Sequence, residues 1–210
     1  MVPASTCSST RYIDTAFELL KLNVTAYSIP FHIPGSQSDR LILHYFCVYG
    51  APELSGYGAM GLPFWNDTLL RLSHDSAVVR QAVIALSCAH LSFSTSALES
   101  DSEAKRDWTK QHEAEALQQY NKAVGRLRRH LADEQQYSAK VALVCCVIFH
   151  CFENACGNFD TALTHLRNGL AIWKRTPGVP ERTTGDADMC SLTYVSVSYT
   201  HLTLPTKRIV

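Results

Sequence analysis

The sequence predicts an all-α fold in which antiparallel helical hairpins stack in a bundle or a TPR-like array. Two observations predict it. Apolar residues recur at spacings of three and four over most of residues 39–176, and one segment there is apolar on every side. Only residues 195–204 alternate in strand fashion, with no upstream strand to pair with. We therefore expect a helical domain at 39–176, a flexible N-terminal segment at 1–38 and an irregular tail at 177–210.

The first predicted helix begins at a cap on Ser38 or Asp39, because the apolar residues at 41, 42, 45 and 46 share one face. Residues 50–52, Gly-Ala-Pro, should end this helix, since proline interrupts helix interiors. The glycines at 56, 58 and 61 predict a turn-rich loop. Pro63 then suits the first position of the next helix.

Two longer helices follow. The pattern predicts a helix at 75–93, with Asp75 and Ser76 as capping candidates, and then a polar, serine-rich connection at 92–102. A long amphipathic helix should run from 103 to 132. Its predicted apolar stripe consists of Leu117, Tyr120, Val124, Leu127 and Leu131.

Residues 141–152 are apolar almost all round, which predicts a helix at the centre of the fold. The run is too short for a membrane span, which needs about 20 apolar residues. Gly157 should stop this helix, and Asn158 should cap the next one. The last stripe consists of Phe159, Ala162, Leu163, Leu166, Leu170 and Trp173. We interpret all these stripes as core and not as a partner groove.

Charge and cysteine content exclude several classes of protein. Lys plus Arg and Asp plus Glu number 19 each, so the chain lacks the basic excess that favours phosphate backbones. The eight cysteines include no Cys-x2-Cys pair, and the N-terminus has no apolar leader. We expect a soluble, reduced, intracellular protein that binds neither nucleic acid nor a membrane.

Candidate chemistry concentrates in the apolar segment. Cys146 and His150 lie four residues apart, a spacing that two metal ligands can use. No carboxylate or second ligand pair is near in sequence, and buried cysteine behaves as a small hydrophobe. Cys145 and Cys151 should be inert for the same reason. We therefore expect no metal, no other cofactor and no enzyme activity.

The remaining histidines and arginines have structural interpretations. His165 could act as a general base, but a packed histidine bonded to backbone or water is favoured. The same interpretation applies to His44, His74 and His90. A basic cluster could contact nucleic acid or serve as an import signal, yet a solvated helix face explains it better. This cluster consists of Arg126, Arg128, Arg129 and His130.

An ordered set of short motifs resembles the helical region that follows the DNA-binding finger in fungal zinc-cluster (Zn2Cys6) transcription factors. The resemblance covers about residues 39–175. Its motif residues are Ala51, Pro52, Glu53, Leu54, Ser55, Gly56, Phe64, Trp65, Tyr120, Gly157, Asn158 and His165. We interpret residues 52–57 as a rigid structural turn that docks Trp65, and not as a ligand loop.

The resemblance implies a nuclear regulatory and protein-interaction module whose partners are other proteins of the transcription machinery or a dimer partner. The family's DNA reader needs six cysteines, and only Cys7 lies near the N-terminus, so direct DNA recognition does not carry over. The alternative is a free-standing, cytoplasmic helical scaffold. Residues 197–210 resemble a sequencing-adapter read-through, which predicts a truncated natural chain; an authentic edge strand is the competing interpretation.

Overall fold

The computed structural model describes residues 34–56, 64–96, 103–133 and 138–176, and within these ranges the chain forms helices and no strand. The all-α prediction is therefore confirmed. The elements are α2 (Gln37–Tyr45), the π-helical turn η2 (Phe46–Gly50), α3 (Ala51–Gly56), the π-helical turn η3 (Phe64–Thr68), α5 (Leu69–Asp75), α6 (Ala77–Ser96), α7 (Glu103–Ala132), α8 (Ala139–Ala155) and α9 (Phe159–Arg175).

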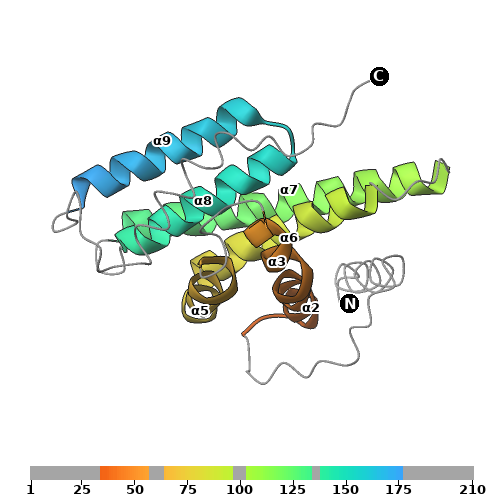
Figure 1. The fold of residues 1–210 in the computed structure, drawn as a ribbon, viewed down its shortest axis with the longest axis horizontal. Coiled ribbons are helices and arrows are strands. Elements are labelled where there is room, and N and C mark those ends of the chain that lie inside the picture. Colours follow the sequence, from red (N-terminus) through yellow and green to blue (C-terminus); the bar gives the residue numbers. More distant parts are fainter. Residues whose placement is uncertain (1–33, 57–63, 97–102, 134–137, 177–210) are drawn as a thin grey trace, which may run out of the picture.

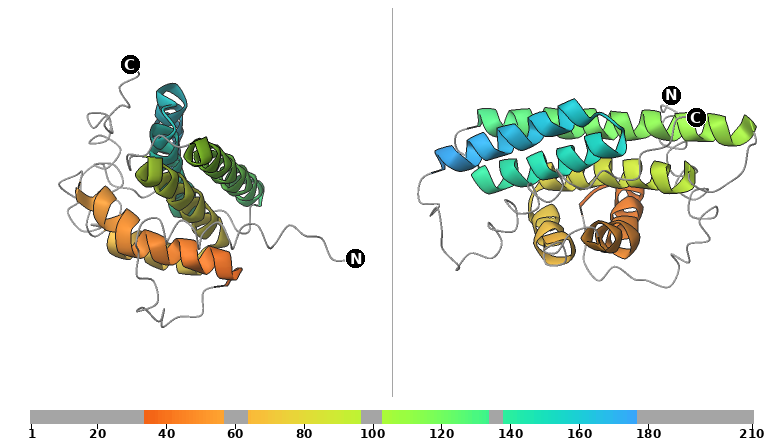
Figure 2. Two further views of the ribbon diagram at one scale, coloured as in Figure 1. Left: turned by 90° about the vertical axis from the view of Figure 1, so that its right-hand side faces the viewer. Right: turned by 45° about the horizontal axis from the view of Figure 1, so that its top comes forward.

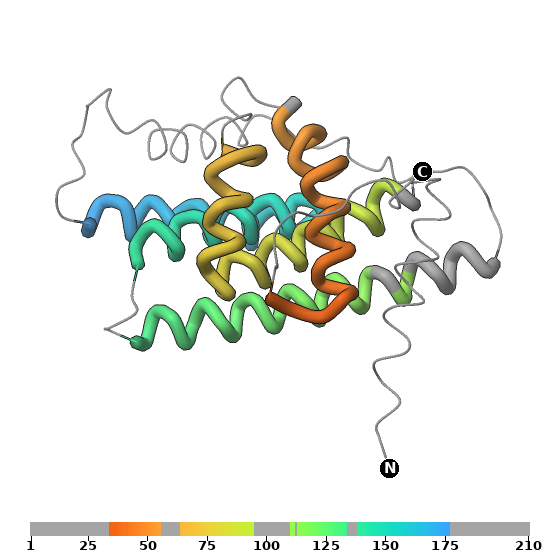
Figure 3. Tube along the Cα trace, turned by 90° about the horizontal axis from the view of Figure 1, so that it is seen from below, coloured from red at the N-terminus to blue at the C-terminus, as the bar shows by residue number. Residues whose placement is uncertain are grey.

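Helix α6 is the centre of the arrangement. It packs against α7 and α8, and it also contacts α2 and α5, whereas α9 packs mainly on α8 and α7 has few contacts with α8. Figures 1 and 2 show α6 to α9 lying along one another, with successive helices reversing direction. Helices α2 and α5 lie side by side across α6 (Figure 3). The TPR-like stacking of these helices stays a prediction.

The start and end of the first helix differ from the prediction. Ser36, and not Ser38 or Asp39, caps α2: its Oγ accepts from the Asp39 N–H at 3.1 Å, and Asp39 Oδ2 accepts from the Ser36 N–H at 2.9 Å. This reciprocal pair is a capping box. The predicted stop at residues 50–52 is wrong, because the helical path continues through η2 into α3 (Figure 3). Pro52 is the second residue of α3 and lies inside this continuous path, so it has no N–H to donate to the preceding π-helical turn.

The buried face of α7 is displaced from the predicted stripe. Leu117 and Leu131 are 48% and 42% exposed, whereas Ala116 and Ala123 are buried with Leu127. The helix bounds are those predicted, and Tyr120, Val124 and Leu127 pack on the core, so the predicted stripe is wrong only at Leu117 and Leu131. The two alanines let α7 approach α6 closely, because a small side chain keeps two helix axes near each other.

The apolar run of α8 is buried as predicted, although α6 and not α8 contacts the most other helices. Every residue from 141 to 152 is buried, and Ser138 caps the helix by accepting from the Val141 N–H at 3.4 Å. Full burial of one large aliphatic or aromatic side chain contributes about 1.5–3 kcal/mol, so this segment makes a large contribution to the apolar stabilisation. Helix α6 includes a window, Ala77–Ser94, that is long and apolar enough to cross a membrane, but 72% of that window is buried inside the fold. The core therefore accounts for its composition.

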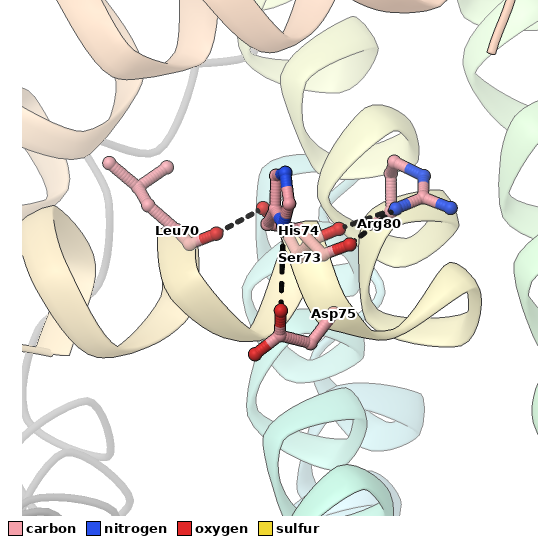
Figure 4. A network of polar contacts seen from close by, with 5 residues as sticks. All are labelled: Leu70, Ser73, His74, Asp75 and Arg80. Carbon is pink, nitrogen blue, oxygen red and sulfur yellow. Dashed lines mark hydrogen bonds and ion pairs between the residues drawn. The ribbon is translucent and has the colours of Figure 1, made fainter. Parts of the chain in front are cut away.

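The junction between α5 and α6 is closed by polar contacts (Figure 4). Arg80 on α6 donates to the carbonyl oxygens of Ser73 at 2.9 Å and His74 at 3.0 Å, and the Ser73 hydroxyl donates to the Leu70 carbonyl at 2.7 Å. A guanidinium at a helix C-terminus satisfies carbonyls that have no intrahelical partner. His74 is exposed beside Asp75, which corrects its prediction as a packed histidine.

Several predictions lie outside the described residues. They concern most of the N-terminal segment 1–38, the glycine loop beyond Gly56, the helix start at Pro63, the strand-like residues 195–204 and the tail 177–210.

Candidate functional site

The family-motif residues gather at two helix junctions. The first is formed by α3 and η3 and includes Ala51, Pro52, Glu53, Leu54, Ser55, Gly56, Phe64 and Trp65. The second lies where α7 meets the turn between α8 and α9 and includes Tyr120, Gly157, Asn158 and His165. Each junction contains a tyrosine hydroxyl bonded to a histidine ring of another helix.

The first junction surrounds a fully buried tryptophan. Trp65 packs edge-on against Phe64, with ring centroids 4.9 Å apart at 75°, and tilted against Phe46 at 6.5 Å. Ala51 and Leu54 of α3 are buried in the same core. Residues of the motif therefore contribute to the core, and the segment is a short helix and not the predicted turn.

A tyrosine and a histidine connect α2 to α6 at this junction. The Tyr45 hydroxyl lies 2.7 Å from Nδ1 of His90. On the other side of the ring, Oε2 of Glu53 lies 3.0 Å from Nε2 but lacks the alignment of a hydrogen bond. Burial lowers the pKa of His90, and the Glu53 carboxylate acts in the opposite direction. Burial also raises the pKa of Tyr45, so both groups are neutral near pH 7.

The second junction is an aromatic and polar group that we call the Tyr120 cluster: Tyr120, Phe149, Phe152, Glu153 and His165. The Tyr120 ring stacks on Phe152 at 4.3 Å and 6°, and it meets the edge of Phe149 at 5.2 Å and 75°. Its hydroxyl lies 2.9 Å from Nε2 of His165. Tyr120 therefore links α7 to α8 through its ring and to α9 through its hydroxyl.

Burial and the buried Glu153 carboxylate together shift the pKa values of the Tyr120 cluster, and burial has the larger effect. Burial raises the pKa of Tyr120, and the Glu153 carboxylate raises it further. Burial lowers the pKa of His165 although Glu153 opposes this shift. The sequence analysis did not single out Glu153. Its only signal there is a carboxylate that directly continues an apolar run.

The turn between α8 and α9 supplies a hydrogen-bond donor to the Glu153 carboxylate. Gly157 has φ +79°, a left-handed conformation that favours glycine, which agrees with the predicted helix stop. Asn158 stands at the N-cap position of α9, but its side chain makes no capping hydrogen bond. Its Nδ2 instead donates to Oε2 of Glu153 at 2.8 Å. The predicted capping role of Asn158 is therefore wrong, because its side-chain oxygen accepts from no N–H in the first turn of α9, while its amide N–H holds the Glu153 carboxylate.

His150 is engaged on both ring nitrogens. Nδ1 donates to the Ala162 carbonyl at 3.1 Å, and Nε2 accepts from Asn154 Nδ2 at 2.9 Å. The neutral tautomer protonated on Nδ1 satisfies both contacts, in agreement with the lowering of the His150 pKa by burial. These contacts leave no nitrogen directed at a metal beside Cys146. Within the ranges that the structure describes, no group of three or more His, Cys, Asp or Glu side chains could hold a metal ion.

The thiols of α8 are protonated at neutral pH. Burial raises the pKa of Cys146 to about 11 and that of Cys151 to about 12, and it also raises the pKa of Cys145. The nucleophilic form of cysteine is the thiolate, so these side chains behave as small core residues.

The basic cluster lies on the outer face of α7. Arg126, Arg128 and Arg129 are exposed, as predicted for a solvated face. Arg126 donates to the Ala77 carbonyl at 3.2 Å, and His130 accepts from the Ser138 N–H at 3.1 Å. These contacts join α7 to the start of α6 and to the cap of α8.

The fold and its two junctions define an all-α domain whose motif residues hold helices together. The family model described as "Fungal specific transcription factor domain" matches residues 40–201, and the chain belongs to this family. The match confirms the resemblance and extends beyond α9. No curated protein matches the chain significantly, and no solved structure does so.

Proposed function

We propose that this chain is the regulatory and protein-interaction module of a fungal zinc-cluster-type transcription factor, acting in the nucleus without reading DNA itself. The family match over residues 40–201 is the observation that carries the proposal. In such a module the helical domain transmits a signal or contacts other proteins, and another element selects the promoter.

Charge and cysteine content support the separation from DNA reading. A binuclear zinc finger needs six cysteines close together, and N-terminal to α2 the sequence has Cys7 alone. The cysteines of α8 are buried and do not offer that ligand set. Equal numbers of basic and acidic residues, 19 each, give no general attraction to phosphates.

The chemistry of the described side chains supports a role in contact and not in turnover. The hydroxyls of Tyr45 and Tyr120 and the thiols of Cys145 and Cys151 have raised pKa values, which makes each a poor nucleophile near pH 7. Each of the two tyrosines is also bonded to a histidine that joins helices.

A tethering experiment tests the proposal. The chain is fused to an unrelated DNA-binding domain in a fungal host, and a reporter with the matching sites is measured. We expect the fusion to change reporter output. The Ile148→Asp variant should abolish the change by unfolding the core, whereas Gln118→Asp adds the same charge on the exposed face of α7 and should leave it intact.

Two results would contradict the proposal. A folded fusion with no effect on the reporter would favour the alternative of a scaffold without a transcriptional role. Sequence-specific binding of the purified chain to duplex DNA at physiological salt, measured by gel shift, would show that it reads DNA itself.

A further inference from the structure

Helix α9 has more apolar surface than its packing on α8 requires. Ala162, Leu166 and Gly169 are buried, whereas Phe159, Leu163 and Leu170 are 44%, 37% and 45% exposed. Spacings of four and seven place the exposed three on one side of the helix. We call Phe159, Leu163 and Leu170 the α9 stripe. Because these three residues are exposed, the prediction that they belong to the core is wrong. Helix α9 itself lies at the edge of the fold (Figure 1).

The charges beside the α9 stripe reverse along the helix. Asp160, Arg167 and Lys174 follow one another at seven-residue intervals, so they run along one flank. Asp160 is in the first turn, and Lys174 and Arg175 are in the last. A parallel copy of α9 would place like charges together. An antiparallel copy would place Asp160 beside the partner's Lys174 at both ends, and only Arg167 would face its own equivalent at the centre.

We propose that a second copy of this chain docks on the α9 stripe, with the two α9 helices antiparallel about a two-fold axis. Each subunit then contributes the same apolar surface to the contact, as an isologous interface requires. This inference deepens the proposed function, on which it rests for its biological meaning, by naming the chain itself as a partner.

The dimer is expected to be weak. A helix of 17 residues is roughly 26 Å long, and one helix pair buries less surface than the ~1,600 Å² of a standard stable interface. Dissociation on dilution within the micromolar range is therefore the expected behaviour. The dimer should also weaken with added salt if the terminal charge pairs contribute.

Sedimentation equilibrium of the whole chain, in reducing buffer over a range of concentrations, provides the first test. The wild type should associate to a dimer, and Leu163→Asp should weaken association by about tenfold or more, because it puts a charge within the apolar contact. Leu117→Asp is the matched control, since Leu117 is 48% exposed on α7. Its dimer should be unchanged, and circular dichroism melting establishes that both variants are folded.

A charge exchange tests the orientation. Asp160→Lys and Lys174→Asp should each weaken the dimer, and the double variant should restore it, since opposite charges again meet in the antiparallel arrangement. Both substitutions oppose the helix dipole, so recovery in the double variant cannot come from greater stability of α9.

The inference is overturned if the wild type is monomeric at every concentration, if Leu163→Asp dimerises like Leu117→Asp, or if the charge exchange fails to restore association. None of these results would prevent the fusion from changing reporter output in the tethering experiment. Conversely, a dimer that obeys these rules in a chain without effect on the reporter would leave the interface standing and refute the transcriptional role.

Discussion

Replacing Gly169 by alanine tests how closely α9 approaches α8. A Cβ added at Gly169 would lie 3.1 Å from the Cβ of Cys146, which is attached directly to the α8 backbone and cannot rotate away. Gly125 on α7 is the matched control, because a Cβ added there meets nothing within 4 Å. Both glycines are inside helices and have ordinary helical backbone angles.

The two substitutions share one free-energy contribution and differ in another. Alanine in place of glycine stabilises a helix interior by about 1 kcal/mol, which applies to both. At Gly169 the helices must also separate by about 0.5 Å to reach an ordinary carbon–carbon contact, and such overpacking costs about 1–3 kcal/mol. Gly125→Ala should therefore raise the free energy of unfolding by about 0.5–1 kcal/mol, whereas Gly169→Ala should leave it unchanged or lower it by up to about 2 kcal/mol.

Urea denaturation in reducing buffer, followed by far-ultraviolet circular dichroism, measures both free energies. Cys146→Gly removes the opposing Cβ and completes a double-mutant cycle with Gly169→Ala. We expect a favourable coupling of about 1–3 kcal/mol between these two substitutions. Cys146→Gly combined with Gly125→Ala should be additive within about 0.5 kcal/mol.

Equal stabilisation by the two glycine replacements would refute this reasoning. It would mean that α8 and α9 do not meet at Gly169 and Cys146. Additivity in the cycle would refute the specific contact even if Gly169→Ala were destabilising.

Three further predictions concern the core, the histidines and the Tyr120 cluster. Ile148→Asp should abolish the circular dichroism signal of the fold, because an unpaired buried charge costs several kcal/mol against a total of about 5–15; a near-wild-type melting temperature would contradict it. Burial lowers the pKa values of His150 and His165 from 6.5, so the unfolded chain binds more protons below pH 6.5. Stability in urea should therefore fall as the pH drops from about 7 to 5, less steeply in His150→Gln; a pH-independent midpoint would exclude this. Tyr120→Phe should cost about 0.5–1.5 kcal/mol, by removing the hydroxyl contact and keeping the stacked ring; a loss as large as that of Tyr120→Ala would place the energy elsewhere.

The sequence predicts the elements with long, regular patterns well. The bounds of α7 follow from its periodicity, and the burial of residues 141–152 follows from a run that is apolar on every side, because each pattern persists over several turns. The side of α7 that is buried cannot be predicted from the pattern, because Leu117 and Ala116 lie on overlapping apolar faces of one helix. The neighbouring helix decides which of them is buried, and that neighbour is a property of the tertiary fold.

Local signals failed where tertiary contacts override them. Gly50 and Pro52 predict a helix end, yet a Cβ at Gly50 would lie 2.8 Å from the Phe46 ring, so the glycine admits an aromatic side chain and the helix continues. The tyrosine–histidine contacts join residues 45 positions apart in both junctions. No pattern along the chain predicts that such distant residues meet. The family resemblance includes both Tyr120 and His165, but only as separate motif residues.

The position of α8 in the chain has a consequence for biosynthesis. Helix α6 packs on α8, but translation completes α6 and the whole of α7 before residues 139–155 leave the ribosome. Until then the nascent polypeptide presents a large uncovered apolar surface, the kind of surface that chaperones bind. A premature stop codon between α7 and α8 should therefore yield an aggregating product instead of a smaller folded domain.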